Sequence, residues 1–142
     1  MNNNKLIVIF GRNHLPFSWL IRVFTWSRWS HCGVVVAGDT HVVEATAKHG
    51  VVMTPIEEFK ERYTDWQIAE LPCDDVRLAH KRLKSQLGKK YDFGAIFGIL
   101  FRTGWNIEDK WFCSELTAYA ANTFREDRVG RITPEDIWSN SK

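Results

Sequence analysis

The chain has 142 residues, 44% hydrophobic and 25% charged, a composition typical of a globular protein and a length that suits one domain, 1–142. A net charge of +2, with Lys and Arg dispersed, excludes the concentrated basic surface that binding to a nucleic-acid backbone requires. The longest apolar stretch, Phe93 to Phe101, is much shorter than the roughly 18 residues of a spanning helix, so we expect a soluble protein without a transmembrane segment.

The N-terminal apolar run, Leu6 to Phe10, is too short for a signal peptide. We therefore expect a cytoplasmic protein, with lysis or non-classical export as routes of release. Three cysteines, Cys32, Cys73 and Cys113, are an odd number without paired spacing, which favours neither a disulfide framework nor a zinc site. We expect at least one free thiol and no metal or cofactor. The sequence does not indicate an oligomeric state.

The first half of the chain predicts mainly strands. Its β-branched runs, bounded by Gly and Pro, predict strands at 6–10, 32–36, 42–46, 51–54 and 66–71. Between the first two, apolar residues at helical spacing predict an amphipathic helix over 16–26. Pro55 opens a short helix over 56–62, because proline is tolerated in the first turn.

The second half predicts helices. Asp74 and Asp75 place negative charge at the start of a helix that runs through Leu87. Further helices are expected at 91–101 and 112–124, and Pro134 begins a last short turn. Four or five antiparallel strands followed by helices indicate an α+β fold, with the sheet packed against helices on one main face.

Cys113 is the candidate nucleophile. It lies in the first turn of a predicted helix, where unpaired backbone N–H groups and the helix dipole favour a thiolate over the ordinary thiol, whose pKa is about 8.5. Leu116, Ala120 and Phe124 continue the same helical stripe, so the thiol faces the core. The competing interpretation is a buried cysteine that packs as a small hydrophobic residue.

His31 is the candidate base, because imidazole titrates near neutral pH and suits proton transfer from a thiol. It begins a strand, where its side chain can meet a helix end on the same side of the sheet. A structural, hydrogen-bonded histidine is the alternative. His14, His49 and His80 lie in surface contexts, and Cys73 has no adjacent base, so we expect none of these four in the site.

The predicted hairpin supplies a third residue. If Gly38-Asp39 is a two-residue turn, the strands pair Ala37 with Thr40, Gly33 with Glu44 and His31 with Thr46. His31 and Glu44 then share one face as diagonal neighbours, and Cys32 and His41 face the other way. Glu44 is therefore expected to orient the ring, although a slip of one residue would move it away. A solvent-facing glutamate on a half-exposed sheet is the alternative.

Several segments together resemble the circularly permuted NlpC-like branch of the papain superfamily, the YiiX/YebB-like group. The resemblance covers 29–138 and rests on Ser30-His31-Cys32-Gly33-Val34-Val35, Val43-Glu44-Ala45, Gly50-Val51 with Pro55 to Phe59, Leu87 to Asp92, Trp111 to Leu116 and Thr133 to Ile137. Cys32 stands where that group more usually has an aliphatic residue. At the N-terminus Gly11-Arg12 replaces a frequent Gly-Asp, and 15–29 has no counterpart.

The resemblance implies a papain-like fold of the permuted NlpC type and a thiol hydrolase, a cysteine peptidase or amidase. We expect His31 to deprotonate Cys113, Glu44 to hold the ring, and backbone N–H groups at the helix start to bind the oxyanion. A thioacyl intermediate follows. Tyr91, Trp111 and Trp29 are expected to contact the substrate.

Three functions remain open from the sequence. The resemblance implies cleavage of an amide bond, for instance in bacterial cell-wall peptides. Lecithin retinol acyltransferase-like relatives act instead on lipid acyl groups, and the aromatic segment 17–29 suits a hydrophobic groove. A noncatalytic binding module is disfavoured because Cys113, His31 and Glu44 are all present.

Overall fold

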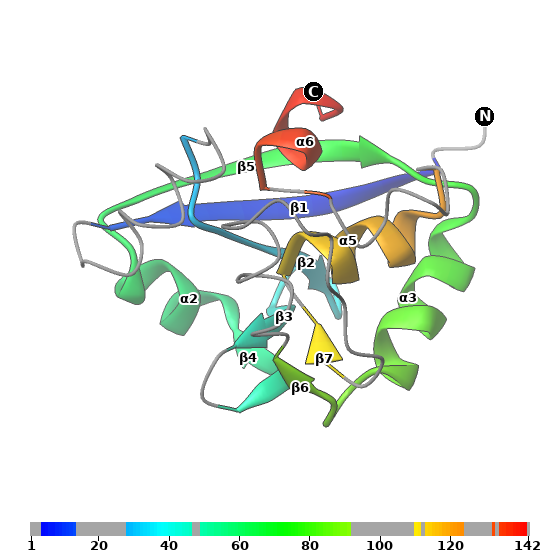
Figure 1. The fold of residues 1–142 in the computed structure, drawn as a ribbon, viewed down its shortest axis with the longest axis horizontal. Helices are drawn as coiled ribbons and strands as arrows, with labels where there is room; N and C mark the ends of the chain where they lie inside the picture. Colours follow the sequence, from blue (N-terminus) through cyan, green and yellow to red (C-terminus); the bar gives the residue numbers. More distant parts are fainter. Residues whose placement is uncertain are drawn as a thin grey trace, which may run out of the picture.

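The computed structural model describes residues 4–13, 28–46, 49–91, 110–111, 113–123, 132 and 134–141, with the backbone alone for 90, 91, 110, 111 and 115. The expected helix over 16–26 and residues 92–101 of the next one lie outside this part. Figure 1 shows five strands that form one antiparallel sheet in the order β4-β3-β2-β1-β5. They are β1 (Lys5–Arg12), β2 (His31–Val36), β3 (His41–Thr46), β4 (Gly50–Pro55) and β5 (Asp65–Pro72). Every strand expected from the sequence is present.

The β2–β3 hairpin has the predicted register, with Val34 opposite Val43 and Val36 opposite His41. Its turn is longer than predicted, because the ladder ends at Val36 and His41 and leaves four residues in the turn. Ala37, Gly38 and Asp39 all adopt positive φ angles, of 56°, 66° and 68°. This left-handed run lengthens the turn without changing which side chains share a face.

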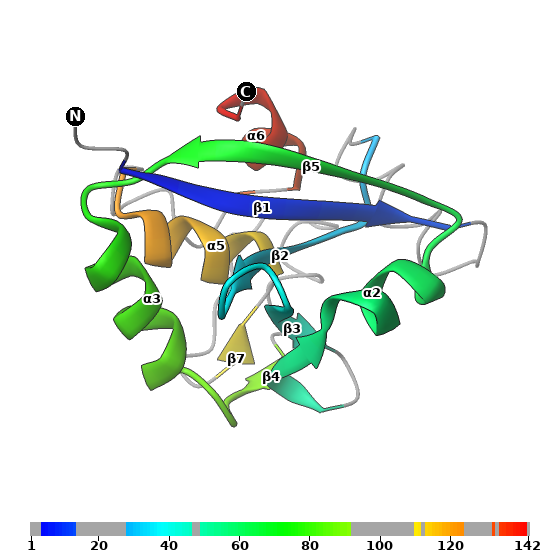
Figure 2. The same ribbon diagram turned by 180° about the vertical axis from the view of Figure 1, so that it is seen from behind.

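Helices cover both faces of the sheet. Most of the core lies under α3 (Val76–Ser85), α5 (Cys113–Ala121) and α6 (Pro134–Ser139), against Leu6, Val8, Cys32, Val34 and Val43. A second cluster places Phe59 of α2 (Ile56–Arg62) against Ile9, Val35 and Val42. The prediction of helices on one main face is therefore correct for α3, α5 and α6, whereas α2 packs on the opposite face. In both views of the ribbon α2 lies well apart from α3 (Figure 1, Figure 2).

The two neighbouring acids before α3 have different tasks. The carboxylate of Asp75 caps the helix by accepting from the backbone N–H groups of Arg77 and Leu78, at 2.8 and 3.1 Å. Asp74 instead accepts from Arg82 at 2.7 and 2.8 Å, and Arg82 also donates to the carbonyl of Ala120 on α5. The pair Asp74–Arg82 thereby ties the end of β5 and α3 to α5.

Two short strands form a separate parallel ladder, in which β6 (Lys90–Tyr91) pairs with β7 (Lys110–Trp111). Tyr91 therefore belongs to a strand, and the prediction that a helix begins there is wrong. The pairing sets Tyr91 opposite Trp111, two residues expected to contact substrate. Within the part of the chain described, no helix has both the length and the apolar character needed to cross a bilayer.

Candidate active site

His31 and Glu44 meet inside the protein. The Nε2 atom of His31 lies 2.9 Å from Oε1 of Glu44, and the two residues are 8% and 0% exposed. The hairpin register brings them to one face, as predicted. Gly33 makes room for this contact, because a Cβ there would lie 2.5 Å from Cγ1 of Val42 and 3.2 Å from Cβ of Glu44. Glu44 is buried and hydrogen-bonded, which rules out the solvent-facing alternative.

Arg62, which was not among the site residues expected from the sequence, is the second partner of Glu44. Its Nη2 donates to Oε2, the oxygen that His31 does not use, and its side chain is 42% exposed. Glu44 is thus held between a histidine and an arginine. A signal existed: Phe59, Arg62 and Tyr63 follow the spacing of one helical face, so an arginine beside the apolar positions of α2 has to reach toward the sheet.

Two aromatic rings on and just after α2 fix the position of His31. The imidazole stacks on Phe59 and Tyr63, with ring centroids 5.7 and 5.8 Å apart and interplanar angles of 26° and 15°. The same two rings lie under the guanidinium of Arg62, at 5.3 and 5.5 Å. His31 and Arg62 therefore contact the same two aromatic rings, and a shift of α2 would move both side chains.

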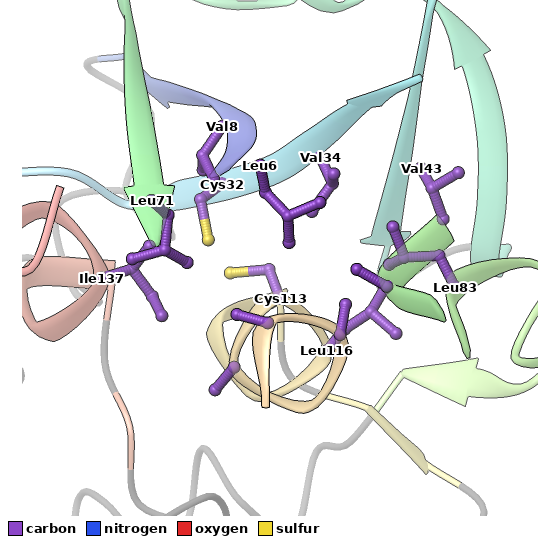
Figure 3. Close-up of a cluster of buried hydrophobic side chains, with 14 of the residues drawn as sticks. Leu6, Val8, Cys32, Val34, Val43, Leu71, Leu83, Cys113, Leu116 and Ile137 are labelled. Atoms are coloured by element: carbon purple, nitrogen blue, oxygen red, sulfur yellow. The ribbon is translucent and has the colours of Figure 1, made fainter. Parts of the chain in front are cut away.

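Cys113 begins α5 and is 1% exposed. It packs in the large core cluster, on the face that carries Cys32, and Figure 3 shows the two sulfur atoms pointing toward one another. From the sequence we expected Cys113 on the His31 side of the sheet. Cys113 nevertheless acts on His31 electrostatically, and the charge of each residue shifts the pKa of the other. His31 is the first residue of β2, so its ring lies at the end of the strand rather than under its middle.

The charges of His31 and Glu44 support each other. Burial lowers the pKa of His31, but the negative charge of Cys113 and the contact with Glu44 outweigh it and raise this pKa to about 9. Burial raises the pKa of Glu44, but His31 and then Arg62 lower it to about 2. Near neutral pH Glu44 is a carboxylate, and His31 is held as an imidazolium when Cys113 carries its negative charge.

The thiol of Cys113 does not follow the expectation of a low pKa. Burial, followed by the neighbouring Cys32, raises the pKa of Cys113 well above that of a free thiol, and His31 acts in the opposite direction. The position of Cys113 at the start of α5 is therefore not enough to lower its pKa. The thiolate forms with the imidazolium of His31 as its counter-charge. Glu44 engages Nε2, which leaves Nδ1 of His31 for the thiol.

The remaining candidates lie in different places. Trp29 is 5% exposed and packs between Phe10 and Trp138, with ring centroids 6.0 and 5.4 Å away, so its position serves the core. The side chains of Tyr91 and Trp111 and all of His14 lie outside the described residues. His49 is exposed, and His80 is half-buried on α3. Cys73 is buried beside Asp74, and burial raises its pKa.

Comparison with known proteins places this chain in a family. Residues 8–134 match a family model described as permuted papain-like amidase enzyme, YaeF/YiiX, C92 family. The chain belongs to this family. The C92 family consists of amidases in a peptidase class, so the resemblance seen in the sequence is confirmed, and so is the α+β fold of the permuted papain-like type. A search of the curated proteins found no match.

Among solved structures, the fold of this C92 family member is similar to a crystal structure titled metalloprotein YiiX, from Escherichia coli O157:H7. The TM-score is 0.64 at 21% sequence identity, over 88% of this chain and 69% of the other. That title assigns a metal to the E. coli protein. In the described residues of this chain, no group of three or more His, Cys, Asp and Glu side chains is arranged to hold a metal ion. His31 and Glu44 instead satisfy each other and Arg62.

Proposed function

We propose that this C92 family member hydrolyses an amide bond with Cys113 as nucleophile, His31 as base and Glu44 as the residue that orients the base. The observation that carries the proposal is the buried hydrogen bond between His31 and Glu44, together with the electrostatic coupling of His31 to the thiol at the start of α5. Thiol hydrolases share this combination of a nucleophile, a base and an orienting acid.

The reaction begins as the thiol proton passes to Nδ1 of His31 and the sulfur attacks the amide carbonyl. The negative charge on the carbonyl oxygen is met by unpaired backbone N–H groups at the start of α5. The imidazolium then gives its proton to the leaving amine, which departs and leaves a thioester on Cys113. Water, deprotonated by His31, hydrolyses the thioester and releases the acid. Glu44 stabilises the imidazolium in both halves of the reaction.

The substrate we propose is a peptide-like amide such as those of bacterial cell-wall peptides. The family description, amidase, and the resemblance to NlpC-like enzymes support this choice. The alternative, transfer or hydrolysis of lipid acyl groups, draws on the aromatic segment 17–29, which lies outside the described residues apart from Arg28 and Trp29. Amide substrates are therefore to be tested first and lipids beside them.

Mass spectrometry of the intact protein tests the proposal. Wild-type protein is mixed separately with cell-wall peptide fragments and with phosphatidylcholine vesicles and quenched in acid within seconds, and Cys113→Ala and Cys73→Ala variants are treated alike. We expect an added acyl mass and a released amine from the peptides with wild type and Cys73→Ala, and neither with Cys113→Ala. Equal turnover by Cys113→Ala would refute the nucleophile, and an adduct formed from the lipid alone would refute the amide substrate.

A further inference from the structure

Glu44 has two carboxylate oxygens, and each has its own partner. Oε1 lies 2.9 Å from Nε2 of His31, and Oε2 accepts from Nη2 of Arg62. Because Glu44 is fully buried, no solvent is available to replace a missing partner. The guanidinium is thus part of the environment that determines whether Glu44 is charged.

The charge on Glu44 decides which nitrogen of neutral His31 carries the proton. An ionised Glu44 only accepts, so Nε2 must donate and Nδ1 is left with a lone pair toward Cys113. A protonated Glu44 would instead donate to Nε2 and leave the proton on Nδ1, where it blocks acceptance of the thiol proton. The base works in only one of these two states.

Arg62 is itself held in place. Its guanidinium lies over the rings of Phe59 and Tyr63, the rings on which His31 stacks. The charged or titratable groups that act on it are Glu44, Tyr63 and Glu58, and those that act on His31 are Cys113 and Glu44. The positively charged groups that act on Glu44 are His31 and Arg62.

We propose that Arg62 is a positioning residue for the amidase reaction: it keeps Glu44 ionised and aimed at Nε2, so that His31 offers Nδ1 to Cys113. This inference rests on the proposed function, in which His31 is the base. It adds a fourth member to the site, one that acts through Glu44 and does not itself contact the reacting atoms.

Kinetics of Arg62→Gln and Arg62→Lys variants test the inference, with Lys60→Gln as a control that removes a positive charge from the same helix. We expect kcat of Arg62→Gln to fall about 10- to 100-fold with KM unchanged, less than the about 10²- to 10⁴-fold supplied by a general base. The acid limb of its pH–rate profile moves to higher pH, because Glu44 protonates more readily. Arg62→Lys recovers part of kcat, and Lys60→Gln behaves as wild type. Circular dichroism checks that each variant is folded.

Nitrogen-15 NMR of the His31 ring gives a readout that does not depend on turnover. In Arg62→Gln we expect His31 to titrate at higher pH than in wild type, because a positive charge beside the pair is removed, and a larger share of the neutral rings to carry the proton on Nδ1, because Glu44 is no longer held against Nε2. If wild type lacks amidase activity but this change occurs, the proposed function fails and the effect of Arg62 on His31 stands. Unchanged kcat and unchanged NMR titration in an active, folded Arg62→Gln variant overturn the inference, as does a raised KM alone, which would mark Arg62 as a substrate-binding residue.

Discussion

The ring of Tyr63 lies directly over Gly11, where a Cβ atom would stand 2.6 Å from Cγ of the tyrosine. Gly11 is also the residue of β1 that pairs with His31 on β2. The absence of a side chain at position 11 therefore lets Tyr63 lie flat against the sheet and stack on the imidazole. Gly11 on β1 thus leaves the space in which Tyr63 stacks on His31.

Gly11→Ala is expected to destabilise the protein by about 1–3 kcal/mol, the usual cost of overpacking, and to reduce turnover because Tyr63 can no longer hold His31. Tyr63→Ala removes the obstructing ring, so the same substitution made in that background should cost far less. Urea unfolding of wild type, both single variants and the double variant measures the coupling. Additive effects of the two substitutions would contradict the steric explanation.

Glu44 and His31, with Cys113 as the largest influence that raises the His31 pKa, predict how stability depends on pH. Folded His31, with a pKa raised from 6.5 to about 9, contributes stability that is complete below about pH 6.5 and lost as the pH rises through about 9. Folded Glu44, with a pKa lowered from 4.5 to about 2, contributes stability that is complete above about pH 4.5 and lost as the pH falls through about 2. The pair stabilises most between pH 4.5 and 6.5.

Glu44→Gln should lower the free energy of unfolding at pH 5.5 by about 3–5 kcal/mol, because it leaves His31 and Arg62 without their buried counter-charge. The loss should be smaller at pH 9.5, where His31 no longer gains from the carboxylate. Urea unfolding at both pH values measures this difference. Glu57→Gln, on the exposed side of α2, is the matched control, and an equal effect of the two variants would show that burial of the carboxylate is unimportant.

The sequence was most informative where structure depends on near neighbours. Strand alternation and the Gly38-Asp39 turn determine the β2–β3 register locally, so the contact between His31 and Glu44 could be predicted without any knowledge of the rest of the fold. The start of α5 at Cys113 also follows from a local helical pattern. Its catalytic role stays a prediction.

What the sequence did not predict depends on how distant elements pack. The spacing within α2 places Arg62 on the helical face of Phe59, but the contact with Glu44 depends on how α2 packs against the sheet, which the helix alone does not specify. The position of Cys113 on the Cys32 face likewise depends on where α5 docks. Burial of the thiol follows from that docking, which is why the low pKa inferred from the helix start alone was wrong.

The influence of His31 on the Cys113 thiol can be measured by alkylation. The positive charge of His31 lowers the pKa of Cys113 against the effect of burial. Replacing His31 by Asn removes this charge, so the pH midpoint for alkylation by iodoacetamide should rise and less thiolate should be present at a given pH below that midpoint. Peptide mass spectrometry after timed alkylation distinguishes Cys113 from Cys32 and Cys73.

His80→Asn serves as the control for this measurement, because His80 lies half-buried on α3 and is not among the groups that act on Cys113. A smaller side chain at position 31 also admits reagent more easily, which changes the maximal rate but not the pH midpoint. The midpoint is therefore the quantity to compare. If His31→Asn and wild type share one midpoint while His80→Asn matches both, then His31 does not act on the thiol, and the base must be sought elsewhere.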